Sequence, residues 1–184
     1  MTKEKILIPL VFLFLVNCSG IDPSTYGAKE PKLVLSEYFD GFTKGWGLVL
    51  DRDEKVIKRF IVKIDGTFTN NGEEGKLVED FVWSDGKTEK RVWFLEKETD
   101  KNWTGKADGV IGSAKGIVSG NSLNWKYAFN LVMEDSVVEN LKVNFNDWMF
   151  LIDDNVLMNR ATFSKFGIHL GTVIITFKKD MLNK

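Results

Sequence analysis

The chain has 184 residues, a length typical of one domain, and its 43% hydrophobic and 28% charged residues indicate a folded core. Lys plus Arg number 25 and Asp plus Glu number 26, so the net charge of -1 argues against a nucleic-acid-binding protein. One Cys and one His exclude an intrachain disulfide, a multi-cysteine metal cage and His-rich zinc sites.

The first 17 residues have the pattern of a secretory signal. Lys3 and Lys5 give a basic start, and an unbroken apolar run of 11 residues follows from Ile6 to Val16. As a helix this run would be about 16 Å long, too short for a bilayer core of about 30 Å. A short apolar run behind a basic start therefore predicts a signal peptide over residues 1–17 rather than a membrane span.

The only cysteine, Cys18, follows this apolar run directly. The sequence around it resembles the lipobox of bacterial lipoproteins, which implies that Cys18 is lipidated and becomes the mature N-terminus. Asn17 departs from that pattern, because a small residue is usual before the cysteine. Ser19 stands where Asp would imply retention in the inner membrane, so the resemblance implies a protein anchored in the outer membrane and facing the periplasm.

Residues 18–32 are predicted to be a lipidated tether, and residues 33–184 a single domain. The tether holds Pro23 and Pro31, and no proline follows in the rest of the chain. A long stretch without proline favours paired strands in which every backbone N–H is used. At most one short helix is predicted, near residues 33–39, where it could cover a barrel end.

The domain shows the period-two alternation of β-strands, with turn signals every 8–15 residues or so. Asp85-Gly86 is the strongest hairpin signal. Such spacing predicts an all-β fold, an antiparallel meander of about 8–10 strands that closes into a barrel, because closure removes exposed edges. The residues predicted to share a face are Phe60, Val62 and Ile64; Arg91, Trp93 and Leu95; Leu123, Trp125, Tyr127, Phe129 and Leu131; and Val173, Ile175 and Phe177.

Two resemblances extend this interpretation. Gly45-Trp46 resembles the first strand of lipocalin-type barrels. This resemblance implies a lipocalin-like barrel in which Trp46 packs under an Arg near the last strand, and Arg160 lies in the right region.

A second resemblance is carried by short segments along most of the chain. They are Tyr38-Phe39-Asp40-Gly41, Gly45-Trp46-Gly47, Arg59-Phe60, Glu79-Asp80-Phe81, Asp85-Gly86, Arg91-Val92-Trp93, Gly105-Lys106-Ala107-Asp108, Gly112-Ser113-Ala114, Gly120-Asn121-Ser122, Asp147-Trp148-Met149, Asp153-Asp154-Asn155, Asn159-Arg160-Ala161 and Lys165-Phe166-Gly167. Over about residues 33–179 the chain resembles an uncharacterised bacterial lipoprotein family, domain of unknown function 3833, which implies a barrel-like body but no activity.

Motifs for cofactors and metals are weak. The glycines from residue 105 to residue 120 lack the spacing of a phosphate-binding loop and are predicted to mark bulges or close backbone contacts. Asp147, Asp153, Asp154 and Asn155 could offer oxygen ligands to calcium, but they lack the spacing of an EF-hand. Asp153-Asp154-Asn155 is predicted to be a hairpin turn. The sequence therefore indicates no cofactor, no metal site and no catalytic residue.

The aromatic face of Trp125, Tyr127 and Phe129 is the leading candidate for a binding site. It either fills the core of a small barrel or lines a cavity for an acyl chain. Arg91, which shares a face with Trp93, and Arg160 are candidate anchors for a carboxylate or phosphate head.

Binding of a lipid or other apolar small molecule in the cell envelope is the favoured function. An alternative is a barrel isomerase or hydratase that uses buried carboxylates, such as Glu79 with Asp108, and Tyr127. Another alternative is a structural envelope subunit with a packed core and a protein partner.

Overall fold

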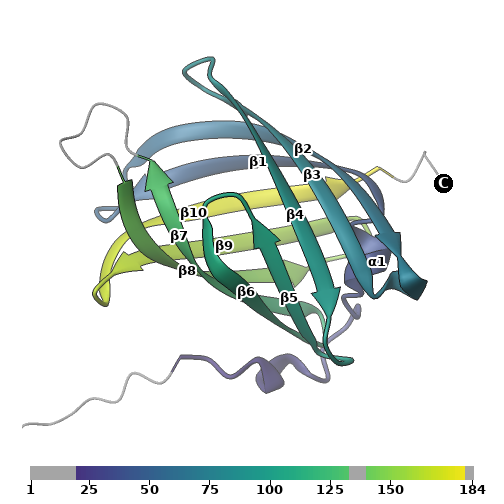
Figure 1. The fold of residues 1–184 in the computed structure, drawn as a ribbon. Helices are drawn as coiled ribbons and strands as arrows, with labels where there is room; N and C mark the ends of the chain where they lie inside the picture. Colours follow the sequence, from purple (N-terminus) through teal and green to yellow (C-terminus); the bar gives the residue numbers. More distant parts are fainter. Residues whose placement is uncertain (1–19, 133–139, 181–184) are drawn as a thin grey trace, which may run out of the picture.

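The structure is a computed structural model that describes residues 20–132 and 140–180, so Cys18 and the predicted signal segment lie outside the described residues. Ten antiparallel strands form one closed barrel, in which each strand pairs with its neighbours in sequence and β1 pairs with β10 (Figure 1). This confirms the predicted all-β meander. The strands are β1 (Gly41–Asp51), β2 (Val56–Thr69), β3 (Glu74–Trp83), β4 (Thr88–Lys97), β5 (Asn102–Ala107), β6 (Val110–Ser119), β7 (Ser122–Val132), β8 (Asn140–Leu151), β9 (Val156–Lys165) and β10 (Ile168–Lys179).

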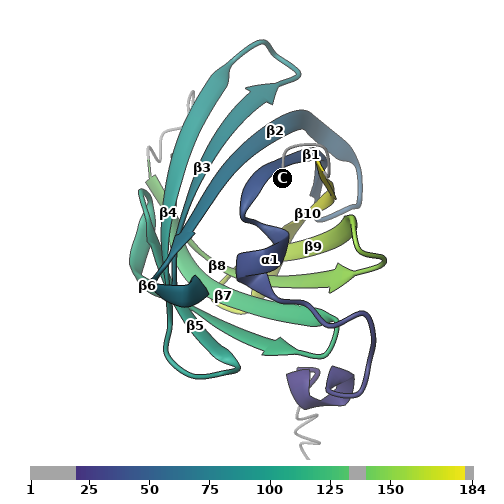
Figure 2. The same cartoon turned by 90° about the vertical axis from the view of Figure 1, so that its right-hand side faces the viewer.

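One end of the barrel is covered by the short helix α1 (Leu35–Tyr38), as the sequence predicted (Figure 2). Leu35 and Tyr38 are buried, and Phe39 packs edge-on against Phe177 of β10. The Lys179 ammonium donates a hydrogen bond to the Tyr38 carbonyl oxygen at 2.8 Å, which ties the end of β10 to this helix. We call the opposite end of the barrel the mouth. None of the helices in the described residues has the length and apolar character needed to cross a bilayer.

Alternation along each strand separates the core from the outer surface. On β2, Phe60, Val62 and Ile64 are buried, whereas Ile61 and Lys63 between them are exposed. Side chains on a strand point alternately to opposite faces, so these three residues line the barrel interior. The other three predicted faces also contribute to the core cluster.

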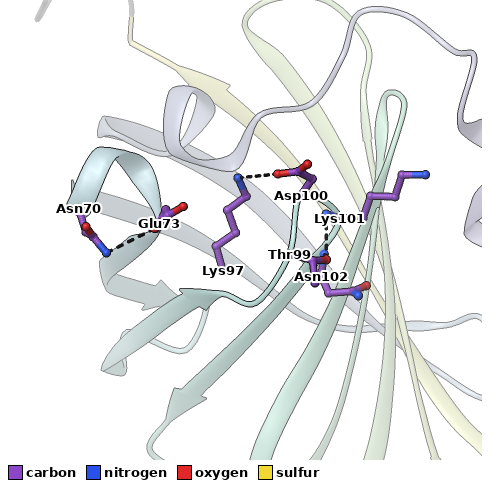
Figure 3. A network of polar contacts seen from close by, with 7 residues as sticks. All are labelled: Asn70, Glu73, Lys97, Thr99, Asp100, Lys101 and Asn102. Atoms are coloured by element: carbon purple, nitrogen blue, oxygen red, sulfur yellow. Dashed lines mark hydrogen bonds and ion pairs between the residues drawn. The ribbon is translucent and has the colours of Figure 1, made fainter.

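The hairpin turns at the α1 end are held by local polar contacts (Figure 3). The 3-10 helix η2 (Asn70–Gly72) follows β2, and after it the Asn70 amide donates to the Glu73 carboxylate at 3.5 Å. After β4, the Thr99 hydroxyl accepts from the backbone N–H of Asn102 at 3.1 Å. The Lys97 N–H also donates to the Glu73 carbonyl at 2.8 Å, which joins the two turns.

The segment before the barrel packs on its outer surface near the α1 end. It contains the 3-10 helix η1 (Pro23–Tyr26), and the Tyr26 ring meets the rings of Trp148 and Phe150 of β8 edge-on at 5.5 and 5.1 Å. Gly120 turns the chain beneath it with φ +59°, and a Cβ there would lie 1.8 Å from the Tyr26 carbonyl oxygen. Any side chain at residue 120 would therefore displace η1.

Trp46 and Arg160, which the resemblance to lipocalin-type barrels pairs, both lie on the outer surface of the barrel. Gly45 and Gly47 face inward, because Cβ atoms at these positions would lie 2.7 Å from Val62 and 2.2 Å from Phe60. Alternation then points Trp46 outward, where it is 44% exposed and the Lys44 ammonium lies 5.1 Å from its ring centre. Arg160 is also exposed, on the outer face of β9.

Candidate functional site

Five of the six predicted ligand-binding residues come together inside the barrel. Trp93 of β4 lies edge-on to Trp125 and Tyr127 of β7, with ring centres 5.9 and 5.5 Å apart. The Arg91 guanidinium lies 5.0 Å from the ring centre of Phe129. These residues belong to strands that are not neighbours, so closure of the barrel brings them into contact. The sixth, Arg160, lies outside and is not part of this group.

Burial of the inward-facing side chains differs between the two ends. Toward α1, Trp93, Leu95 and Trp125 are buried and close the core. Toward the mouth, side chains that also point inward keep an intermediate exposed surface. They are Tyr127, Phe129, Phe145, Phe163, Val173 and Ile175. These side chains are therefore partly accessible to solvent at the mouth.

A group of polar side chains lies inside the barrel, beside these aromatic rings. We call Glu79, Glu89, Arg91, Tyr127 and Asp147 the polar belt. Glu79 of β3 lies directly opposite Arg91 of β4 in the antiparallel register. The Arg91 guanidinium donates to the Glu89 carboxylate at 2.5 Å and stacks on Phe81 at 5.3 Å. Arg91 is thus paired with acidic side chains already present in the barrel.

The other half of the belt is formed by Tyr127 and Asp147. The Tyr127 hydroxyl donates to Asp147 Oδ2 at 3.5 Å, a long hydrogen bond. The Tyr127 ring stacks on Phe145 at 5.0 Å, which holds the hydroxyl over β8. Asp147 is 6% exposed, and its Oδ1 atom has no hydrogen-bond partner among the described residues. A buried polar atom without a partner costs about 1–3 kcal/mol, so a hydrogen-bonding group placed at Oδ1 would stabilise the protein.

The interior environment shifts the pKa values of the belt. Burial raises the pKa of Glu79 to about 7, although the nearby Arg91 charge opposes this shift. Burial raises the pKa of Asp147 to about 8 against the hydrogen bond from Tyr127. Burial would lower the pKa of Arg91, but the charges of Glu79 and Glu89 raise it above its usual value. At neutral pH the belt therefore holds a cationic Arg91, a protonated Asp147 and a partly protonated Glu79.

The proposed pairing of Glu79 with Asp108 is not formed, because Asp108 lies exposed at the turn between β5 and β6. The carboxylates that act on one another here are different: the Glu89 charge adds to the raised pKa of Glu79, and the Glu79 charge adds to the raised pKa of Asp147. From the sequence, Asp147 was considered only as a calcium ligand, and its place in the barrel interior was missed. The alternation along β8 could have identified Asp147 as an inward-facing residue, because it shares its face with the buried Val143 and Leu151.

Neither the outer surface nor a metal-binding cluster in the described part of the chain offers a better candidate site than the interior. A depression of about 700 Å³ lies over the outer faces of β2 to β5, but the exposed charged residues Lys76, Glu96 and Lys106 line it. Within residues 20–132 and 140–180, no group of three His, Cys, Asp or Glu side chains is placed to hold a metal ion. The interior, with its aromatic rings and polar belt, remains the candidate site.

Comparisons with known proteins place the fold and the family. No curated protein matches the sequence. The S-type phycobiliprotein lyase CPES from Guillardia theta is similar in structure, with a TM-score of 0.57 and 9% identity over 79% of this chain and 90% of that one. A DUF3598 protein of unknown function from Nostoc punctiforme gives a TM-score of 0.54 and 9% identity over 83% of this chain and 51% of that one. At this identity the likeness shows the barrel fold alone. The sequence matches the DUF3833 family over residues 12–179, and the chain therefore belongs to this family of proteins of unknown function.

Proposed function

We propose that the barrel binds an apolar small molecule, such as a lipid, which enters through the mouth. The observation that carries this proposal is the half-buried aromatic layer formed by inward-facing residues such as Phe129, Phe145 and Phe163. A packed core would bury these rings, as it does Trp93 and Trp125 toward α1. Ligand sites in proteins are mostly apolar with a few placed polar groups, and the polar belt supplies such groups. The proposal is also supported by the barrel fold that this chain shares with a phycobiliprotein lyase.

Shortening Phe129 is expected to change ligand binding more than stability. The Phe129 ring centre lies 6.2 and 6.0 Å from those of Tyr127 and Phe145 and 5.0 Å from the Arg91 guanidinium, and the side chain is only half-buried. We expect Phe129→Ala to weaken binding of a fluorescent fatty acid or apolar dye by about tenfold, since roughly 25 cal/mol is lost per Å² of apolar contact. Fluorescence titration measures this effect.

Phe94→Ala is the matched control, because Phe94 is 59% exposed on the outer face of β4. It should leave binding unchanged. Wild-type protein that binds no fatty acid, phospholipid or apolar dye, together with a loss of about 3–5 kcal/mol of stability in Phe129→Ala, would reject the proposal. That result would favour a packed structural barrel with a protein partner.

Catalysis is a second candidate, because two carboxyl groups, Glu79 and Asp147, face the same interior beside Tyr127. Their raised pKa values, about 7 and about 8, suit proton transfer near neutral pH. An isomerase or hydratase would use one of them as base and the other as acid. Mass spectrometry of the ligand recovered from the binding mixture separates the two functions, because a binding protein returns it unchanged.

We also propose that the protein is an outer-membrane lipoprotein on the periplasmic side, anchored through Cys18. The support is the apolar run of residues 6–16 directly before the only thiol of the chain. Cys18→Ser is expected to abolish labelling with radioactive palmitate and to release the protein from membranes, because each buried acyl CH₂ contributes about 0.8 kcal/mol. Cys18→Ser protein that still takes up palmitate, or stays membrane-bound after a carbonate wash, would contradict the anchor.

A further inference from the structure

The surroundings of Asp147 indicate which chemical class of ligand the barrel binds. Its side chain lies on the inner face of β8, opposite Trp125 of β7 and Ala161 of β9, neither of which offers a charge. Oδ2 accepts from Tyr127, and Oδ1 has no partner among the described residues. A side chain that is 94% buried with one free oxygen facing the interior is a prepared hydrogen-bonding group.

The charges that face Asp147 across the interior come from β3 and β4. Glu79 and Arg91 both act on its carboxyl group, and Glu89 holds the guanidinium of Arg91. One cation therefore faces up to three acidic groups. An anionic ligand head would compete with Glu89 for Arg91 and would meet the other carboxyl groups. This arrangement argues against the carboxylate or phosphate head for which Arg91 was the predicted anchor.

The protonation state of Asp147 supports a neutral head as well. Burial raises the pKa of Asp147 to about 8, so at pH 7 the carboxyl group carries its proton. Tyr127 occupies Oδ2 as a donor, which leaves the hydroxyl of the acid at Oδ1. A protonated carboxyl donates through this O–H and needs an acceptor oxygen.

We infer that Asp147 recognises the carbonyl oxygen of an uncharged, largely apolar ligand, such as a ketone or ester, by donating a hydrogen bond from Oδ1. This inference rests on the proposed binding function and names the class of ligand. The apolar body of the ligand lies among the aromatic rings of the mouth, and its carbonyl group reaches the polar belt.

Four ligands of similar length test the inference, each measured by displacement of the neutral dye N-phenyl-naphthylamine. They are methyl decyl ketone, dodecane, dodecylamine and dodecanoic acid. We expect the ketone to bind about tenfold more tightly than dodecane, because it satisfies a buried donor. The amine and the acid are expected to bind no better than dodecane at pH 7.

Two variants at one position separate the hydrogen bond from the shape of the site. Asp147→Leu removes the donor, and we expect a tenfold loss of ketone binding with dodecane binding unchanged. Asp147→Asn keeps an N–H donor without a titrating proton, so it should retain ketone binding within about threefold. In the wild type, ketone affinity should fall as pH rises through about 8, where Asp147 loses its proton. The Asn variant should show no such fall.

The inference and the proposed function fail in different ways. The inference is overturned, while apolar binding stands, if dodecane and the dye bind but the ketone binds no more tightly than dodecane. The same holds if Asp147→Leu protein binds the ketone and dodecane as tightly as the wild type does. Tighter binding of dodecylamine, increasing with pH, would also overturn it, because an ionised Asp147 would then be the recognising group. If neither the dye nor any of the four ligands binds, the proposed function itself fails.

Discussion

At pH 9, Asp147→Asn protein should be more stable to urea than the wild type, by an amount on the order of 3 kcal/mol. In the folded wild type the pKa of Asp147 is raised to about 8, whereas in the unfolded chain it lies near 3.8. Between these values the folded state holds a proton that the unfolded state has released. The wild type therefore loses stability as pH rises from about 4 to about 8, and an Asn at this position has no proton to lose.

Urea unfolding at pH 5, 7 and 9 measures the difference, and the two proteins should approach each other at pH 5. Asp80→Asn is the control, because Asp80 lies on the outer face of β3 and its side chain is 55% exposed. Its substitution should leave the pH dependence as in the wild type. Parallel stability curves for wild type and Asp147→Asn would show that Asp147 is ionised in the folded protein.

Gly116→Ala should lower the free energy of unfolding by about 2–3 kcal/mol, although the change adds a single methyl group. Gly105 of β5 and Gly116 of β6 lie against the Trp125 indole, and Cβ atoms there would come within 2.5 and 2.2 Å of its ring. Both contacts are with a buried, rigid side chain, so the indole must move into Trp93, its neighbour at 5.9 Å. Thermal or urea unfolding measures the loss.

A double-mutant cycle shows whether the clash with Trp125 is the cause. Trp125→Leu makes room at the ring position, so adding Gly116→Ala to it should cost much less than adding it to the wild type. Lys115→Ala, on the outer face of the same strand, is expected to change stability by less than about 0.5 kcal/mol. Equal costs of Gly116→Ala with and without Trp125 would refute a steric origin.

Local alternation was sufficient to predict the strands and their inward faces. The period-two pattern of residues 123–131 placed Trp125, Tyr127 and Phe129 together, and the structure confirms it. The helix near residues 33–39 followed from apolar residues at an end of the domain, and α1 confirms it. Both features depend on residues close in sequence, where side-chain direction follows from the period alone.

Contacts between distant strands were not predictable in the same way. The position of Asp147 beside Tyr127 depends on the register between β7 and β8, and its approach to Glu79 depends on closure of the whole barrel. Trp46 was paired with Arg160 from a resemblance, whereas its outward direction depends on Phe60 and Phe177, whose rings leave room only for glycine at the inner positions on either side of it. Such packing depends on side chains that are far apart in sequence, so it cannot be predicted from the alternation within one strand.

The packing of η1 on β8 limits how far an anchored barrel can stand from a bilayer. Tyr26 holds this segment at the α1 end, and Asp22 caps its first turn by accepting from the Ser24 N–H at 2.8 Å. If Cys18 is held in a membrane, Asp22 follows four residues later and can lie at most about 14 Å from it. In the proposed anchored protein, the covered end of the barrel would lie close to the lipid surface, and the mouth would face away from it. Ligand exchange through the mouth would therefore take place with a carrier or a second membrane rather than with the leaflet that holds the anchor.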